Sequence, residues 1–292
     1  MERPPDITRR GLLRAAMAAG AAGPLAGLAP AALARDARPA DRGDPWRGLK
    51  VGVATYSLSK LPLDAAIKGL VKVGARYASI KDAHLPLDAV ASRRKEVARR
   101  FLDAGITPLS CGVITLTDDD RALRNAFEYA RDAGFATIVC KPTRQSLPKL
   151  DALVKEFDIR VAIHNHGPED KAWPSPLVAW EAIRPFDPRI GVCIDVGHTA
   201  RCAVDPVAAI RTCAPRLYDL HMKDLESIEA KSRPVEVGRG VLDVRAMFRA
   251  LLDVGFSHHV GLEYEKDLAD PLPGVAESLG YIRGILATMG AA

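Results

Sequence analysis

The sequence predicts an α/β fold of the (β/α)8 or TIM-barrel type, and three observations support that prediction. After residue 48, short runs rich in valine and isoleucine alternate with longer stretches that have the apolar spacing of amphipathic helices. Eight such units fit into about 245 residues, which is the usual size of this barrel. No G-x-G-x-x-G follows the first predicted strand, where a Rossmann fold would place it. A doubly wound parallel sheet is therefore the weaker alternative.

The predicted strands are short apolar runs, and amphipathic segments separate most of them. The strands are expected at Lys50–Thr55, Tyr77–Lys81, Thr107–Val113, Thr137–Cys140, Ile159–His164, Ile190–Asp195, Leu217–His221 and His259–Glu263. The helices are expected at Leu63–Val73, Ala89–Ala104, Asp120–Ala133, Leu147–Phe157, Pro206–Cys213, Val244–Val254 and Val275–Met289.

Turn and cap residues mark the ends of several predicted helices. A glycine that follows a helix takes the left-handed conformation at low cost, and four predicted helices are followed by one, at Gly74, Gly105, Gly134 and Gly255. An aspartate in front of a helix accepts hydrogen bonds from its first free N–H groups. Asp118 and Asp243 are predicted to do so.

Residues 1–34 are predicted to be an export signal and not part of the fold. Arg9 and Arg10 precede an uncharged run of alanine, glycine, leucine and proline, and Ala32-Leu33-Ala34 fits a cleavage site. The pattern resembles a twin-arginine signal, which implies a periplasmic or other extracytoplasmic location. An uncleaved membrane anchor is the alternative, but prolines interrupt the run and make it a poor spanning helix. No stable membrane span is expected after cleavage.

Composition and charge narrow the classes of partner. The chain has 292 residues, of which 48% are hydrophobic and 26% charged, as in ordinary globular proteins. Its net charge of +5 falls to +3 without the signal, too little basic excess to suggest nucleic acid or anionic lipid. Five cysteines without a C-x-x-C argue against a disulfide framework or zinc finger. Residues 35–48 are predicted to be a linker and 49–292 the catalytic barrel domain.

Histidine and carboxylate side chains gather where the predicted strands end. In this fold the active site lies at the carboxyl ends of the strands. Five of the seven histidines lie there, whereas His258 and His259 precede the last strand and are expected at the opposite rim. The five are His84, His164, His166, His198 and His221. Together with Asp195 and Glu263 they predict a site for a divalent metal ion.

The ordered motifs carry a family resemblance. Asp195-Val196-Gly197-His198, His221-Met222-Lys223-Asp224 and Leu262-Glu263 resemble the sugar phosphate isomerase/epimerase superfamily, the xylose isomerase-like TIM barrels. The resemblance covers roughly residues 49–290. It implies one divalent metal ion, held by the residues at the ends of strands five to eight. These residues are His164, Asp195, His221 and Glu263.

Strand five departs from the family pattern. The family's sugar epimerases carry a glutamate where this chain has His164, and that glutamate shares proton transfer with the one on strand eight. The two-carboxylate mechanism therefore does not carry over unchanged. The added imidazole favours Mn, Co, Zn, Ni or Fe over Mg as the bound ion.

The remaining candidates are assigned by their places at the barrel mouth. Glu263 or His166 is predicted to remove a proton next to a carbonyl, with Lys223 as a further catalytic group. The predicted substrate-binding residues are Lys81, His84, Lys141, His198, Arg239 and Glu265.

The leading hypothesis is a metal-dependent enzyme that acts on a sugar or keto-sugar through an enediolate. It would be an isomerase or epimerase, or a lyase or hydratase that expels a β-substituent. A phosphorylated substrate is not expected, because the chain is predicted to be exported.

Two alternatives remain. A non-catalytic exported sugar-binding barrel would need aromatic platforms, for which Tyr56, Trp173 and Tyr264 are the nearest candidates. A nuclease resembling endonuclease IV is disfavoured, because Leu225–Arg233 contains no histidine and the charge is near neutral. The sequence leaves the oligomeric state open.

Overall fold

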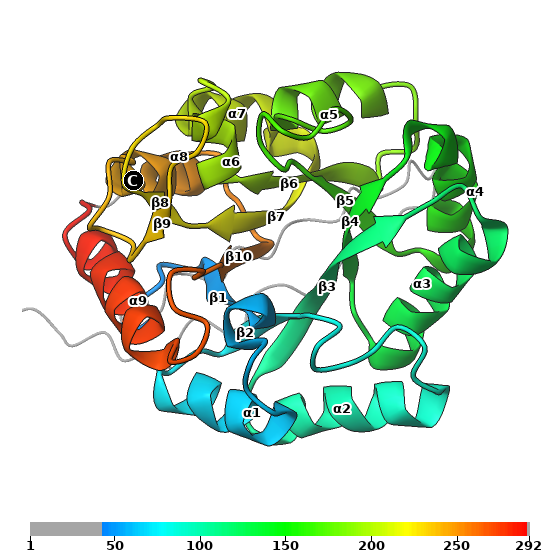
Figure 1. Ribbon diagram of the computed structural model, residues 1–292, viewed down its shortest axis with the longest axis horizontal. Coiled ribbons are helices and arrows are strands. Elements are labelled where there is room, and N and C mark those ends of the chain that lie inside the picture. Colours follow the sequence, from blue (N-terminus) through cyan, green and yellow to red (C-terminus); the bar gives the residue numbers. More distant parts are fainter. Residues whose placement is uncertain (1–42, 291–292) are drawn as a thin grey trace, which may run out of the picture. The chain divides into compact units, whose positions relative to one another are not determined.

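The computed structural model describes residues 43–290, which form a closed barrel of eight parallel strands (Figure 1). Strands that follow one another in the chain lie side by side, and the last pairs with the first. The predicted (β/α)8 barrel is therefore confirmed. The barrel strands are β1 (Lys50–Ala54), β2 (Tyr77–Ile80), β3 (Thr107–Leu116), β4 (Thr137–Pro142), β5 (Arg160–His164), β6 (Ile190–Asp195), β7 (Leu217–Met222) and β10 (His259–Leu262).

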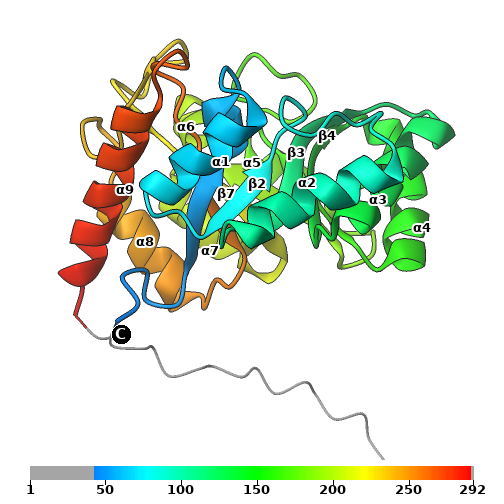
Figure 2. The ribbon, with the colours of Figure 1, turned by 90° about the horizontal axis from the view of Figure 1, so that it is seen from below.

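Helices cover the outside of the barrel, as the side view in Figure 2 shows for α1, α2 and α9. The α-helices are α1 (Leu63–Lys72), α2 (Ala91–Asp103), α3 (Asp120–Ala133), α4 (Leu147–Phe157), α5 (Pro176–Ile183), α6 (Val196–Arg201), α7 (Pro206–Cys213), α8 (Val244–Asp253) and α9 (Leu272–Ala287). Two further strands, β8 (Asp224–Leu225) and β9 (Pro234–Val235), form a small antiparallel pair outside the barrel. No helix among the described residues is long and apolar enough to cross a membrane.

The core lies between the helices and the strands and continues inside the barrel. Every residue of β6 is buried, as expected for a parallel strand covered on both faces. Helix α3 buries Leu123, Phe127 and Ala130, whose spacing of three and four places them on one face. Burying a side chain such as Leu123 or Phe127 contributes about 1.5–3 kcal/mol. This packing holds the strand ends in fixed relative positions.

A buried polar group lies inside the barrel below the carboxyl ends of the strands. Asp219 on β7 accepts a hydrogen bond from Ser110 on β3 at 2.5 Å, and its other carboxylate oxygen lies 3.4 Å from His259 Nδ1. All three residues are buried. His259 is the first residue of β10, so it lies at the amino end of the strand, as predicted, and its ring faces Asp219. Gly261 leaves room for this ring. A Cβ at Gly261 would lie 2.7 Å from the His259 ring.

The predicted caps agree with the structure at all but one position. The four glycines that follow helices have positive φ, for example 76° at Gly134 after α3. The Asp243 carboxylate accepts from the Ala246 N–H at 2.8 Å and caps α8. The prediction for Asp118 is wrong by one residue: Asp119 caps α3, because it directly precedes the first helical residue and accepts from the Ala122 N–H at 2.7 Å.

Replacing Asp119 by alanine is expected to lower the free energy of unfolding by about 1 kcal/mol, because the first turn of α3 loses its acceptor. Asp118→Ala is the matched control, since the neighbouring carboxylate only forms an exposed ion pair with Lys149. Urea denaturation of both variants measures the difference. Equal stability of the two variants would contradict the assigned cap.

Other differences from the predictions concern short or irregular segments. Helices α5 and α6 and the pair β8–β9 have no counterpart among the predicted elements. Helix α6 and the two strands are too short for a clear period, and α5 is apolar at all but one position, so it has no amphipathic pattern. Strand β3 extends to Leu116 and contains an irregularity between Cys111 and Ile114 where its pairing with β4 shifts. Helix α9 begins at Leu272, three residues before the predicted start. The predicted signal, residues 1–34, and linker residues 35–42 lie outside the described residues.

Candidate active site

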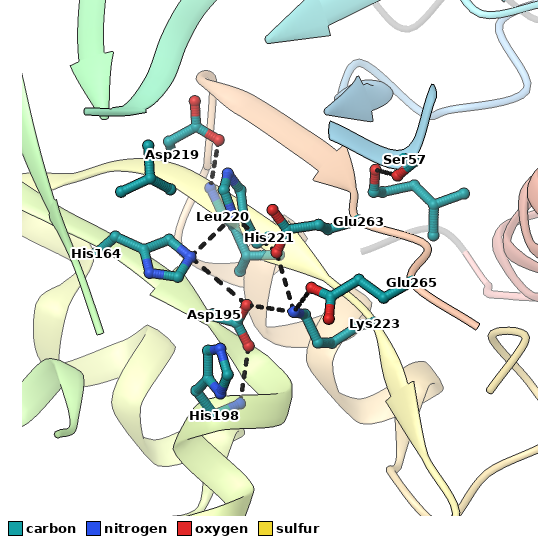
Figure 3. Close-up of polar contacts among 12 residues, drawn as sticks. Ser57, His164, Asp195, His198, Asp219, Leu220, His221, Lys223, Glu263 and Glu265 are labelled. Carbon is teal, nitrogen blue, oxygen red and sulfur yellow. Dashed lines mark hydrogen bonds and ion pairs between the residues drawn. The ribbon is translucent and has the colours of Figure 1, made fainter. Parts of the chain in front are cut away.

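The four residues predicted to bind a metal ion lie together at the carboxyl end of the barrel (Figure 3). His164 Nε2 lies 2.9 Å from His221 Nδ1 and 3.5 Å from Asp195 Oδ2. His221 Nδ1 lies 3.3 Å from Glu263 Oε2. The four side chains are buried, and one ligand atom from each lies within 4.8 Å of all the others. Adjacent strands β5, β6, β7 and β10 supply them, so barrel closure brings them together.

The geometry and chemistry of this cluster fit a divalent metal ion. Two atoms that bind one ion at about 2.1 Å lie no more than about 4.2 Å apart, and the three distances given above satisfy that limit. Asp195 Oδ2 is buried and lies between two nitrogens, 3.5 Å from His164 Nε2 and 2.9 Å from the Lys223 ammonium, so this position already attracts a cation. Two imidazoles and two carboxylates suit a first-row transition metal better than Mg.

The histidine on β5 is prepared to act as a neutral ligand. Burial lowers the pKa of His164 to about 3, against the opposing effect of the Asp195 carboxylate. The ring is therefore uncharged at neutral pH and offers a nitrogen lone pair. Metal ligation requires this form of imidazole.

Asn165 fixes the relative positions of two ligands. Its side-chain oxygen accepts from the Asp195 backbone N–H at 2.9 Å, and its amide donates to the Asp195 carbonyl at 3.3 Å. The ends of β5 and β6 are thereby joined next to His164. Sequence reasoning missed this residue, although its place between two histidines was a usable signal.

The ammonium group of Lys223 lies among three carboxylates. It is 2.9 Å from Asp195 Oδ2, 2.9 Å from Glu263 Oε2 and 2.7 Å from Glu265 Oε1. Burial alone would raise the pKa values of Asp195 and Glu263, but the lysine charge holds both well below their usual range. Gly197 makes room for this side chain, because a Cβ there would lie 2.7 Å from the lysine methylenes.

A cavity of about 260 Å³, here called the reaction pocket, opens directly onto two of the four ligands, His164 and Glu263. His166 and His198 stack in its wall with ring centroids 6.0 Å apart. The pocket is also lined by other predicted residues, Lys81 and Glu265, and by Tyr56 and Val113. Predicted catalytic and substrate-binding groups therefore meet the ligands in one cavity. Nothing in the sequence around Val113 predicted that this residue would line the pocket, because its exposure depends on the irregularity in β3.

Three predicted substrate-binding residues do not line the reaction pocket. The buried His84 ring has Nε2 3.2 Å from the Leu61 carbonyl oxygen. Lys141 forms an ion pair with Asp170. Arg239 binds the Glu277 carboxylate through two nitrogens, one at 2.8 Å. None of the three lines the reaction pocket, and contact between these residues and a substrate stays a prediction.

Two of the three aromatic candidates are also directed elsewhere. Trp173 is buried and donates from Nε1 to the Pro142 carbonyl at 2.6 Å. The Tyr264 hydroxyl donates to Glu236 at 3.3 Å. Only Tyr56 of the three reaches the reaction pocket. The pocket therefore lacks the paired aromatic platforms of a pure sugar-binding site.

A comparison with protein-family models decides the family. The model described as a xylose isomerase-like TIM barrel matches residues 70–285. The chain belongs to the xylose isomerase-like TIM barrel family. Most of the barrel and all four clustered ligands lie within the matched range.

Solved structures of similar fold include sugar epimerases. An uncharacterized protein from Parabacteroides distasonis is 25% identical with a TM-score of 0.64, covering 81% of this chain and 99% of that one. The 3-keto-D-glucoside 4-epimerase from E. coli is 14% identical with a TM-score of 0.67, covering 81% and 99%. An L-ribulose 3-epimerase is 16% identical with a TM-score of 0.67, covering 82% and 95%. No curated protein matched the sequence.

Proposed function

We propose that this member of the xylose isomerase-like family is a divalent-metal-dependent enzyme that acts on a sugar or keto-sugar by removing the proton next to a carbonyl. The reaction is an isomerisation or epimerisation, or the loss of a β-substituent. The observation that carries the proposal is the buried cluster of four candidate ligands, two of which line a pocket that also contains proton-transfer groups. We further propose that residues 1–34 direct the protein out of the cytoplasm.

The four ligands would hold the ion at the floor of the reaction pocket. A divalent ion supplies Lewis-acid polarisation of a substrate carbonyl and so makes the neighbouring C–H more acidic. Lys223 holds Asp195 and Glu263 ionised and in position. Lys81 and Glu265 at the pocket wall are placed to hydrogen-bond substrate hydroxyls.

His166 is the better placed of the two candidate bases. Its Nδ1 lies 3.2 Å from the His164 carbonyl oxygen, to which it donates, so Nε2 carries the lone pair. Burial and the nearby Lys141 ammonium lower the pKa of His166, so the ring is neutral at physiological pH. The Glu263 carboxylate, by contrast, is already engaged by His221 and Lys223. We therefore assign the first proton transfer to His166.

Proton NMR in D2O tests this function. The metal-loaded protein is mixed with methyl 3-keto-β-D-glucoside, chosen because the E. coli structure is named for a 3-keto-D-glucoside. Deuterium is expected at a carbon next to the ketone, and the product spectrum distinguishes an epimer from an eliminated species. His166→Gln is expected to reduce the exchange rate by about 10²–10⁴-fold with metal content unchanged.

The alternative has a distinct outcome in the same experiment. A non-catalytic exported sugar-binding barrel would bind keto-sugars without any exchange of carbon-bound hydrogen. Binding without deuterium incorporation across a panel of keto-glycosides and free ketoses would therefore overturn the proposed reaction.

A further inference from the structure

A second cavity of about 250 Å³ adjoins the reaction pocket, and we call it the side pocket. Lys81 and Val113 line both cavities. The side pocket continues along β3 to Ile114 and Thr115 and across to Asp82 and Leu87 after β2.

The Lys81 side chain and the Val113 backbone are in contact where the two pockets meet. Lys81 Nζ donates to the Val113 carbonyl at 3.1 Å and lies 3.5 Å from an Asp82 carboxylate oxygen. Val113 lies in the irregular part of β3, where regular pairing with β4 is interrupted. Such irregularities commonly turn backbone groups toward an active site. Lys81 is partly exposed, so a ligand can replace its hydrogen bond to Val113 and contact the linings of both pockets.

The sizes of the two cavities favour an extended ligand. Pockets for small molecules usually have volumes of about 300–1,000 Å³. The reaction pocket, at about 260 Å³, and the side pocket, at about 250 Å³, each fall below this range, whereas together they lie within it. The two volumes are almost equal, so they suit two groups of similar size.

The lining of the side pocket indicates the chemistry of the second group. The Asp82 carboxylate and the exposed Thr115 hydroxyl offer hydrogen bonds to hydroxyl groups. Leu87 and Ile114 offer an apolar surface. A sugar ring has hydroxyls on its edge and C–H groups on its faces, which matches this mixture.

We propose that the side pocket binds the second sugar unit of a disaccharide whose reacting ring lies in the reaction pocket. Lys81, at the junction, donates a hydrogen bond to the oxygen that links the two rings. The identity of the reacting ring rests on the proposed function, whereas the existence of a second sugar subsite does not. The substrate class is accordingly a disaccharide and not a free monosaccharide.

Binding of two unreactive probes tests the subsite without turnover. Cellobiose and methyl β-D-glucoside share one ring and lack a ketone, so calorimetry measures their affinities alone. The wild type is expected to bind cellobiose at least about tenfold more tightly, a difference of about 1.4 kcal/mol. Thr115→Trp fills the side pocket from an exposed position and is expected to remove the preference. Thr117→Trp, an exposed neighbour outside the pocket lining, is the matched control and should retain it.

The outcomes separate this proposal from the proposed function. Equal affinity for the two probes in the wild type, no binding of either, or an equal loss for both in Thr115→Trp would overturn the subsite. If cellobiose is preferred but methyl 3-keto-β-D-glucoside undergoes no hydrogen exchange, the subsite stands and the proposed reaction fails. If the keto-glucoside reacts but cellobiose has no advantage, the reaction stands and the subsite fails.

Discussion

Replacing Asp195 by asparagine is expected to abolish stoichiometric binding of a divalent metal ion and, with it, turnover. Asp195 Oδ2 is buried, faces His164, and contributes a negative charge that a neutral amide lacks. Losing an outer-shell partner of a metal ligand typically costs about 10–100-fold in affinity, and the loss of a ligand itself should exceed that. Metal content after dialysis, measured by elemental analysis, and competition with a chromophoric chelator provide the measurement.

The controls for this variant follow from the two roles of the Asp195 carboxylate. Oδ1 accepts from the His198 N–H at 2.8 Å and caps α6, a contact that the asparagine side-chain oxygen can retain. Asp205→Ala removes the corresponding cap of α7, where Asp205 accepts from the Val207 N–H, and should leave metal content unchanged. Full metal stoichiometry in Asp195→Asn would show that the ion is bound elsewhere.

Replacing Lys223 by methionine is expected to lower the free energy of unfolding of the metal-free protein by about 3–5 kcal/mol. Such a loss is typical when one partner of a buried ion pair is removed and the other charge stays buried. Here the carboxylates of Asp195, Glu263 and Glu265 would all lose the same cation. Affinity for the metal ion is expected to rise, because the ammonium repels a second cation near the shared oxygens.

Urea denaturation with and without excess metal separates these two effects. Bound metal stabilises the folded state by mass action, so the deficit of Lys223→Met should shrink when metal is present. Lys155→Met is the control, since its ion pair with Asp151 is more than half exposed on the lysine side and contributes about 0–1 kcal/mol. If Lys223→Met left the free energy of unfolding of the metal-free protein unchanged, the lysine would not be needed to stabilise the three buried carboxylates.

The sequence allowed the barrel and the cluster of four candidate metal ligands to be predicted because both follow from local patterns. Apolar runs of strand length alternate with segments that have the apolar spacing of helices, and this alternation shows where each strand ends. Barrel topology then places Asp195 and Glu263 at one mouth without knowledge of distances. Even the inward direction of His259 had a signal, since His259, Gly261 and Glu263 alternate along one strand face.

The directions of longer side chains could not be predicted in this way. His84, Lys141 and Arg239 stand at or near the mouth, but each turns toward a partner brought close only by the fold. The shared lining of the two pockets at Val113 likewise depends on a local irregularity in β3, for which the sequence has no distinctive residue pattern. Contacts between distant segments thus decide which residues at the mouth face the substrate.

The two oxygens of Asp195 have a consequence for how this site tolerates evolutionary change. One oxygen caps α6 and the other faces the cluster, so a replacement must satisfy a helix terminus and a cation together. The His164 side chain caps no helix, and the contacts given above for its ring are all with residues of the site. A substitution at the end of β6 is therefore expected to disturb more contacts than one at the end of β5. Changes of reaction are therefore expected to be easier at the end of β5, where this chain has His164 and the family resemblance implies a glutamate in sugar epimerases.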